Sequence, residues 1–548
     1  MSSTTPTPAA AGGPPAAVEG QMSHRQILSA LSGLLLAMFV AILSSTVVSA
    51  ALPEIIADLK GGQSSYTWVV TATLLTMTIS TPIWGKMSDL FNRKQLIQLG
   101  LVIYLSGSIL AGFASSTTWL IACRAIQGVG VGALTALVQV ILSDLVSPRE
   151  RGRYMGYLGA VFGLGTVAGP VIGGLLTDGI GWRACFFVGV PFALIALVLL
   201  QRTLNLPTKR RDDVHIDVLG GTFMAAGVAS ILIWVSLAGK NFDWVSGTSA
   251  LMVIGGIVLL IAAVLVERRA PEPLIPLDLF ENRTVVMAVI ASVAVGVAMF
   301  GTTLFLTQYM QLARGYSPTA SGLLTIPMVI GLFGSSTLSG RRISQTGHYK
   351  RFMLAGTVGL TVGLALMGTI DEQTSLVEVG VFMFILGAGI GMVMQNLILA
   401  VQNVIPTEKI GAGSALIAFF RSLGGAVGVS VLGAILGSKV ASSTADGLAS
   451  RGIDAAGSAP SGSSIPDVGA LPGPVQAVVE HAYGTGVAEV FLIAAPLGLV
   501  AFAAVWFLRE KALGTKSGLE LAAERAAAVE DDDDPRAIAS ELREPALR

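Results

Sequence analysis

Charged side chains are scarce in this chain of 548 residues. Asp, Glu, Lys and Arg together make up 12% of it, whereas a soluble globular domain carries about 25%. Hydrophobic residues make up 53%, which excludes a water-soluble protein. Acidic and basic residues are equal in number, at 34 each, so the net charge gives no indication of a nucleic-acid partner. The composition therefore predicts an all-α protein that crosses a lipid bilayer many times.

Cysteine and histidine are also rare, with two and four copies. Cys123 and Cys185 both fall in apolar segments, where they supply neither a disulfide framework nor a metal cluster. The histidines are scattered, and the sequence contains no Walker loop, nucleophile elbow or CxxC pair. We therefore expect no enzyme activity, no cofactor, no metal and no direct use of ATP.

The sequence is instead rich in long apolar runs, each sufficient to cross a hydrocarbon core of about 30 Å as a helix. They follow a tail at 1–22 that is rich in Ala, Pro, Thr and Gly and is predicted to be disordered. The fourteen runs lie near 27–51, 67–84, 96–114, 118–142, 154–177, 184–202, 217–239, 248–266, 284–310, 318–339, 352–370, 376–402, 411–436 and 486–508. An even number of spans places both termini on one side of the membrane.

The positions of Lys and Arg predict which side that is. With the N-terminus inside, the inside segments hold 26 of these residues and the outside segments hold 6. Arg124 and Arg421 lie within spans. Because cytoplasmic segments are enriched in Lys and Arg, we expect a multi-pass protein of the cell membrane with both termini cytoplasmic.

Two glycine patterns recur along the chain. The loop motif that begins at Gly85 has an echo at Gly340, and the Gly-x-Gly-x-Gly motif at Gly128 recurs at Gly387. The two offsets, 255 and 259 residues, nearly agree. This repetition predicts two six-helix bundles of the same orientation, separated by an inserted helix pair.

The repeat also predicts the boundaries of the segments. The expected order is a tail at 1–22, an N-terminal bundle at 23–202, linkers and the inserted pair at 203–283, a C-terminal bundle at 284–508 with an outside loop at 437–485, and a cytoplasmic tail at 509–548.

The fifth run contains Gly-Thr-Val-Ala-Gly-Pro-Val-Ile-Gly-Gly-Leu-Leu over 165–176. Gly165, Gly169 and Gly173 are four residues apart on one helix face, where a neighbouring helix can approach to backbone contact. Pro170 bends the helix there, and Gly174 follows. The pattern resembles the fifth-helix signature of antiporters in the major facilitator superfamily.

Other motifs extend this resemblance over residues 27 to 508. The loop from Gly85 to Lys94 and the fourth-run motif around Arg124 are similar to signatures of the superfamily. Trp182-Arg183 and Arg421 are similar to landmarks of its 14-spanner drug:proton antiporter branch, the EmrB/QacA-like multidrug efflux transporters. The resemblance implies a major facilitator fold and proton-driven export of amphipathic drugs or other lipophilic molecules by alternating access.

The resemblance also implies roles for particular residues. A gating latch would use Gly85, Asp89, Arg93 and Lys94; coupling would use Arg124 and Gln127; the antiporter motif would comprise Gly165, Gly169, Pro170, Gly173 and Gly174. From the residues themselves, uncharged polar side chains within spans are candidates for the substrate cavity: Ser44, Ser45, Ser49, Gln308, Gln311, Gln395 and Asn396. We expect a monomer whose partners are the bilayer, the substrate and a proton.

Two positions depart from the pattern of the branch. The branch commonly has an acid in its first helix where this chain has Ser44, and Asn92 replaces the Gly of the loop motif. Asn tolerates the turn that Gly would supply, but Ser cannot titrate. The alternatives are therefore a facilitator, an exporter coupled to another ion, or a receptor or scaffold derived from a transporter.

The charge asymmetry generates a test of the topology. A single engineered cysteine at Thr208 should react with an impermeant thiol reagent only from the inside, and one at Asp454 only from the outside. Labelling of both positions from the same side would contradict the fourteen-span topology.

Overall fold

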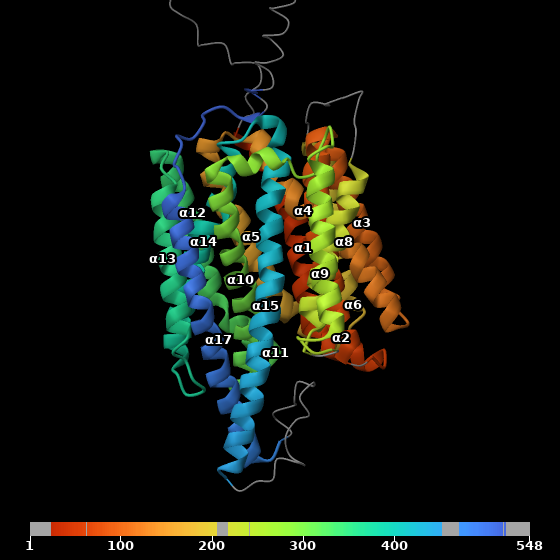
Figure 1. Ribbon diagram of the computed structural model, residues 1–548, viewed down its shortest axis with the longest axis vertical. Coiled ribbons are helices and arrows are strands. Elements are labelled where there is room, and N and C mark those ends of the chain that lie inside the picture. Colours follow the sequence, from red (N-terminus) through yellow and green to blue (C-terminus); the bar gives the residue numbers. More distant parts are fainter. Residues whose placement is uncertain are drawn as a thin grey trace, which may run out of the picture.

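The computed structural model describes residues 24–61, 63–204, 217–239, 242–451, 471–518 and 520–521, and its helices run side by side along one axis (Figure 1). The first half comprises α1 (His24–Asp58), α2 (Gln63–Leu90), α3 (Arg93–Gly112), α4 (Thr117–Leu145), α5 (Pro148–Gly179), α6 (Ala184–Phe187) and α7 (Gly189–Thr203). The short α6 and α7 together form one span, Ala184–Thr203.

The chain continues through an inserted pair into the second half. The pair is α8 (Val218–Leu237) and α9 (Gly247–Glu267). The second half comprises η1 (Leu277–Glu281), α10 (Arg283–Gln308), the π turn η2 (Tyr309–Ala313), α11 (Pro318–Leu324), α12 (Ile326–Thr346), α13 (Lys350–Met367), α14 (Leu376–Gln402), η3 (Thr407–Lys409), α15 (Ile410–Ala449) and α17 (Gly473–Phe507).

Thirteen helical segments of the described chain are long and apolar enough to cross a membrane. The predicted span at 67–84 is not among them, because α2 carries several threonines. Their hydroxyls are bonded within the protein: Thr73 Oγ1 donates to Arg124 O (3.2 Å) and Thr76 Oγ1 donates to Ala125 O (2.8 Å) of α4. With 28 residues packed along α4, α2 is the fourteenth helix of spanning length.

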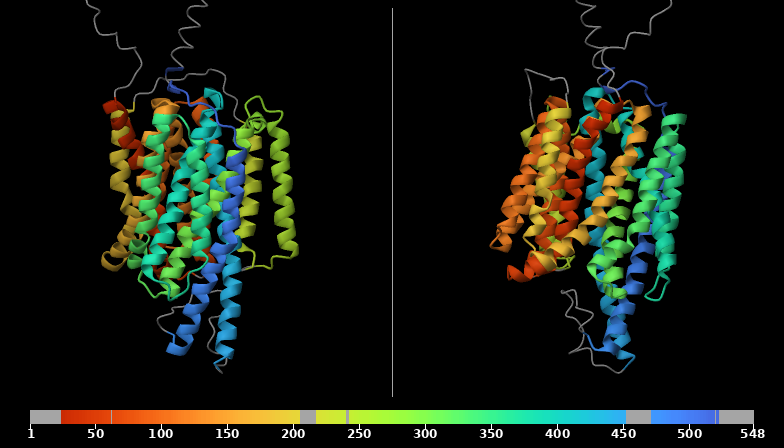
Figure 2. Two further views of the ribbon diagram at one scale, coloured as in Figure 1. Left: turned by 90° about the vertical axis from the view of Figure 1, so that its left-hand side faces the viewer. Right: turned by 180° about the vertical axis from the view of Figure 1, so that it is seen from behind.

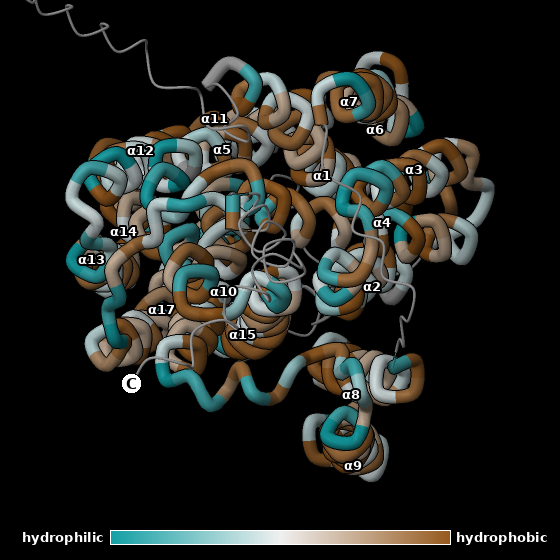
Figure 3. The backbone as a smooth tube through the Cα atoms, turned by 90° about the horizontal axis from the view of Figure 1, so that it is seen from above, coloured by the Kyte–Doolittle hydropathy of each residue, from teal (hydrophilic) through white to brown (hydrophobic). Residues whose placement is uncertain are grey.

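The two halves lie side by side, and the inserted pair lies against their seam (Figures 2 and 3). In the seam, α2 packs on α15 and α5 packs on α12, which are equivalent contacts under the repeat. The pair contacts α2 and α15 through α8, whereas α9 packs chiefly on α8. The architecture confirms the predicted all-helical fold.

Helix α5 packs against helices from both halves. On its α1 side, a Cβ added to Gly165 would lie 2.7 Å from Ile42, and one added to Gly169 would meet the side chain of Thr46. Thr46 Oγ1 also donates a hydrogen bond to Gly165 O (2.9 Å). On its other side, Gly156 faces Thr337 of α12. Small residues therefore let α5 pack closely on both neighbours.

The prediction of a loop over 437–485 is wrong at both ends. Helix α15 continues to Ala449, and α17 already begins at Gly473 (Figure 1). The two helices extend together beyond the rest of the bundle as a hairpin (Figure 2). Its apolar contact is formed by Leu448 of α15 with Val475, Val478 and Val479 of α17. The abundance of Gly, Ser and Ala suggested a loop, but Ala favours helix and the buried aliphatic residues stabilise the pair.

Some predicted features fall outside the described residues. These are the tail at 1–22, the acidic end of the predicted C-terminal tail, and the labelling positions Thr208 and Asp454.

The packing of α5 generates a second prediction. Gly169→Leu should abolish the export that the resemblance implies, or make it leaky, while leaving folded protein in the membrane. The reason is that a side chain there would collide with Thr46, whose backbone carbon lies 3.0 Å from an added Cβ. The measurement is efflux of a fluorescent amphipathic dye from cells, with membrane-inserted protein quantified in parallel.

The matched control is Gly255→Leu on α9, where nothing lies within 4 Å of an added Cβ. Normal efflux by the Gly169→Leu variant would show that close packing of α5 on α1 is not required.

Candidate functional site

The carboxylate of Asp89, near the end of α2, faces the start of α15. Its Oδ1 accepts a hydrogen bond from Gly411 N (2.8 Å), and its Oδ2 accepts one from Ala412 N (2.9 Å). The first N–H groups of a helix have no partner within the helix and carry a partial positive charge. Asp89 therefore caps α15 and joins the first half of the chain to the second.

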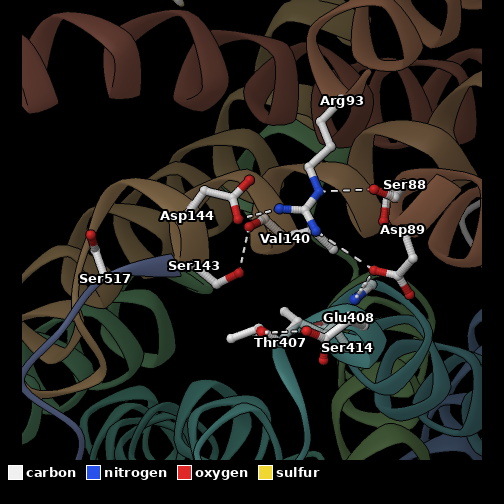
Figure 4. Close-up of polar contacts among 12 residues, drawn as sticks. Ser88, Asp89, Arg93, Val140, Ser143, Asp144, Thr407, Glu408, Ser414 and Ser517 are labelled. Carbon is white, nitrogen blue, oxygen red and sulfur yellow. Dashed lines mark hydrogen bonds and ion pairs between the residues drawn. The ribbon is translucent and has the colours of Figure 1, made fainter. Parts of the chain in front are cut away.

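The guanidinium of Arg93 lies between two carboxylates (Figure 4). Its Nη2 is 3.6 Å from Asp89 Oδ1, its Nη1 pairs with Asp144 Oδ1 of α4, and its Nε donates to Ser88 O (2.9 Å). The side chains of Arg93, Asp89 and Asp144 are 7%, 4% and 12% exposed. Removing one member of such a buried charged group typically costs about 3–5 kcal/mol.

Four glycines bring the backbones of the two halves into contact beside this cluster. A Cβ added to Gly85 would lie 2.9 Å from Gly411 O, and one added to Gly152 would lie 2.5 Å from Gly340 O. The two pairs are related by the internal repeat. We call this end of the bundle the latch face, and in this structure it is closed.

Lys94, which was predicted to belong to the latch, does not reach it. Its Nζ donates to Gln201 O of α7 (2.8 Å), because the start of α3 turns the side chain away from the seam. Its backbone N–H instead donates to the side chain of Asn92 (2.9 Å), which caps α3. Asn92 thus has a helix-capping role at the position where the branch carries Gly.

A second buried cation at the latch face was missed by sequence reasoning. Arg151 Nη1 donates to Gln402 Oε1 of α14, and Nη2 donates to Ser143 O (3.2 Å) and Val146 O (3.1 Å). Gln402 Nε2 in turn donates to Ser414 Oγ of α15 (2.7 Å). From the sequence, Arg151 was only one positive charge among many, although its place beside a repeated glycine was an available signal.

The seven candidate cavity residues do not form one site. Gln395 lies in the seam, where its Oε1 accepts from Gln139 Nε2 of the first half (3.0 Å), while Asn396 Nδ2 donates to Met392 O of its own helix (2.7 Å). Gln308 and Gln311 lie at the π turn that follows α10, at the end opposite the latch face. Ser44, Ser45 and Ser49 lie on α1, where Ser44 is buried and Ser49 is exposed.

Arg124 is buried in the first half and is 3% exposed. Its Nη1 donates to Gln127 Oε1 (3.1 Å), and Gln127 Nε2 donates to Ser108 Oγ (2.6 Å). The hydroxyl of Tyr104 lies beside Ser108 and Ser44, so this polar chain reaches the position where the branch carries an acid. The structure thus brings Arg124 and Gln127 together, and the oxygen atoms that accept these two hydrogen bonds belong to neutral side chains.

At the opposite end of the first half, Trp182 and Arg183 both contact Asp58 at the end of α1. Trp182 Nε1 donates to Asp58 Oδ2 (2.9 Å), and Arg183 Nη1 lies 3.2 Å from the same oxygen. The guanidinium of Arg183 stacks 4.2 Å from the ring centre of Trp182. The hydrogen bond from Trp182, followed by the interactions with Arg183, lowers the pKa of Asp58 below its ordinary value. These contacts give Trp182 and Arg183 a structural role at the end of α1.

The closed seam, the repeated halves and the bilayer-spanning helices define a membrane transport protein built from two bundles. The sequence matches the model of the Major Facilitator Superfamily over residues 34–429. The chain belongs to the major facilitator superfamily and is a transporter, not an enzyme.

Similar proteins include bacterial transporters. The chain is 35% identical to the multidrug transporter protein MdtP of Bacillus subtilis (strain 168) over 425 residues, which cover 77% of each chain. It is 35% identical over 507 residues to an uncharacterized MFS-type transporter of Mycobacterium tuberculosis (strain ATCC 25618 / H37Rv), covering 92% of this chain and 72% of that one. Among solved structures, the proton:xylose symporter XylE superposes with a TM-score of 0.61 at 15% identity, covering 91% and 99% of the two chains. This last likeness concerns the fold alone.

The latch generates a third prediction. Asp89→Asn should reduce transport by about tenfold or more. The substitution removes the negative charge that pairs with Arg93, and it places a neutral amide against the N–H groups of α15. The measurement is the initial rate of dye efflux, normalised to folded protein.

The matched control is Glu150→Gln, which removes an exposed carboxylate from the latch face. Equal rates for Asp89→Asn and the unaltered protein would contradict the prediction that Asp89 is a gating residue.

Proposed function

We propose that this transporter exports amphipathic drugs or other lipophilic small molecules by proton antiport, with alternating access and with the latch face in the cytoplasm. The observation that carries the proposal is the capping of α15 by Asp89, a contact between halves that has to break whenever the latch face opens. Relatives named a multidrug transporter and a multidrug resistance protein support the substrate class. The excess of basic residues in the predicted inside segments supports the orientation.

Arg124 is proposed to take part in coupling without titrating. A guanidinium within a span costs about 2.5–3.5 kcal/mol on insertion scales, so its retention at a buried position favours a function. Its fixed charge would lower the proton affinity of a nearby carboxylate or repel a bound cation, so substrate and proton would compete through its field. Gln127 would hold the guanidinium in place.

The proton carrier has to differ from the one that the branch uses, because Ser44 cannot titrate. Asp89 and Asp144 are the buried carboxylates that contact the seam, and both share Arg93. Glu489 is a less suitable carrier, since it pairs with Lys439 (2.8 Å) on the hairpin of α15 and α17. We therefore propose that protonation of the Asp89–Arg93–Asp144 cluster accompanies the opening of the latch face.

The second candidate is a facilitator, or an exporter coupled to another ion. It is favoured by the neutral surroundings of Arg124 and by Ser44, because a facilitator requires no titrating group within the spans. A receptor or scaffold is the third candidate, and it would keep the fold without flux.

One experiment separates the three candidates. The protein is reconstituted in liposomes, and accumulation of ethidium or of an anionic amphiphile is measured under an imposed pH gradient, an imposed Na⁺ gradient and neither. Uphill accumulation with the pH gradient supports proton antiport. Accumulation with Na⁺ alone, downhill flux alone, or absence of flux supports the other-ion exporter, the facilitator or the scaffold, respectively.

The role of Arg124 generates a fourth prediction. Arg124→Gln should insert and purify as folded protein but lose uphill, pH-driven export, and Arg124→Lys should restore it only in part because Lys lacks the planar fork. The control for loss of a positive charge is Arg153→Gln, an exposed residue of α5. Unaltered proton-driven flux in Arg124→Gln would reduce Arg124 to a structural contact between helices and favour the facilitator.

A further inference from the structure

The chain that follows α17 does not leave the protein but runs along the latch face. Glu510 Oε1 accepts hydrogen bonds from Tyr349 N (2.8 Å) and Lys350 N (3.0 Å), which begin α13. The hydroxyl of Tyr349 also accepts a hydrogen bond from Lys511 N (3.2 Å). Leu513, with 7% exposure, is part of the core of the second half. This segment is therefore built onto the second half.

The side chain of Asn403, at the end of α14, binds the backbone of the same segment. Its Nδ2 donates to Lys511 O (3.2 Å) and Ala512 O (3.0 Å), and its Oδ1 accepts from Gly514 N (3.0 Å). One amide side chain thus satisfies three polar groups of an extended chain. Such a set of bonds requires a defined conformation of the segment, since a displacement of one residue would break all three.

The segment then crosses to the first half. Arg149 N, at the start of α5, donates to Gly514 O (3.1 Å). Gly518 lies against Asp144, with an added Cβ 3.0 Å from Asp144 Oδ1. Ser517 is 8% exposed, and it lies on the Asp144 side of Arg93 (Figure 4). The crossing therefore ends beside the carboxylate that pairs with Arg93.

We propose that residues 509–518 form a strap that holds the latch face closed and has to release from the first half before that face opens. The strap is anchored on the second half through Glu510 and Asn403. On the first half it accepts the hydrogen bond of Arg149 N, and Gly518 packs against Asp144. Movement of one half away from the other would break the contacts on one side of the seam. The strap thus sets the ratio of open to closed latch face, independently of which substrate or ion the protein carries.

The test measures opening directly. Spin labels are attached to cysteines at Gln95 of α3 and Arg351 of α13, two exposed positions at the latch face on opposite halves, in a background with Cys123→Ala and Cys185→Ala. Distance distributions are recorded in lipid nanodiscs without substrate. The strap is loosened by Asn403→Ala together with Glu510→Ala, and the matched control is Thr515→Ala, an exposed residue of the same strap.

We expect the loosened strap to raise the ratio of long to short distances at least tenfold, because the double variant removes five hydrogen bonds and the loss of one or two of ordinary strength already changes such a ratio about tenfold. The control should match the unaltered protein. Identical distributions for the loosened and control variants would overturn the proposal.

A second variant tests the strap without weakening the fold. A Cβ added to Gly514 lies 3.6 Å from Pro148 Cγ, so Pro148→Cys with Gly514→Cys should form a disulfide on oxidation. This cross-link should abolish dye efflux and reduction should restore it. Full efflux by the cross-linked protein, with the bond verified by mass spectrometry of the linked peptides, would show that the strap need not release.

Discussion

The latch face depends on one contact, the approach of α2 to α15 at backbone distance. Only glycine at Gly85 and Gly411 permits it, and only at that distance can the carboxylate of Asp89 reach the first N–H groups of α15. The same approach recurs at Gly152 and Gly340, so the repeat produces a seam with two equivalent closures. The close backbone packing at the glycines and the stabilisation of the start of α15 by a carboxylate therefore depend on each other.

The electrostatics of the interior differ from those of the latch face. At the latch face, Arg93 is compensated by two carboxylates, whereas Arg124 has neutral acceptors on Gln127 and on the backbone of α2. A charge held by dipoles alone retains much of its field, because no opposite charge cancels it. Ser44, which lies on the same polar chain, also carries no charge, so the positive potential of Arg124 extends into the surrounding helices.

Most of the fold could be predicted from the sequence, because a membrane-spanning helix is recognised by the length of its apolar run and by the basic residues that flank it. Local motifs also drew attention to Asp89, Arg93, Arg124 and Gln127, which the structure places in buried polar contacts. The Arg151–Gln402 contact could not be predicted, since it joins residues 251 apart whose pairing depends on how the halves dock. The loop assigned to 437–485 failed for a related reason: its helices are stabilised by each other, a tertiary effect that composition does not record.

Length gives the hairpin of α15 and α17 a mechanical property. With 40 residues, α15 measures about 60 Å at 1.5 Å per residue, roughly twice the hydrocarbon thickness of a bilayer. Its first turn is the one that Asp89 caps, so the end at the gate and the distant tip belong to one continuous rod. In a rotation about a pivot near the middle of the bundle, the tip would move through a wider arc than the latch face, because it lies farther from that pivot.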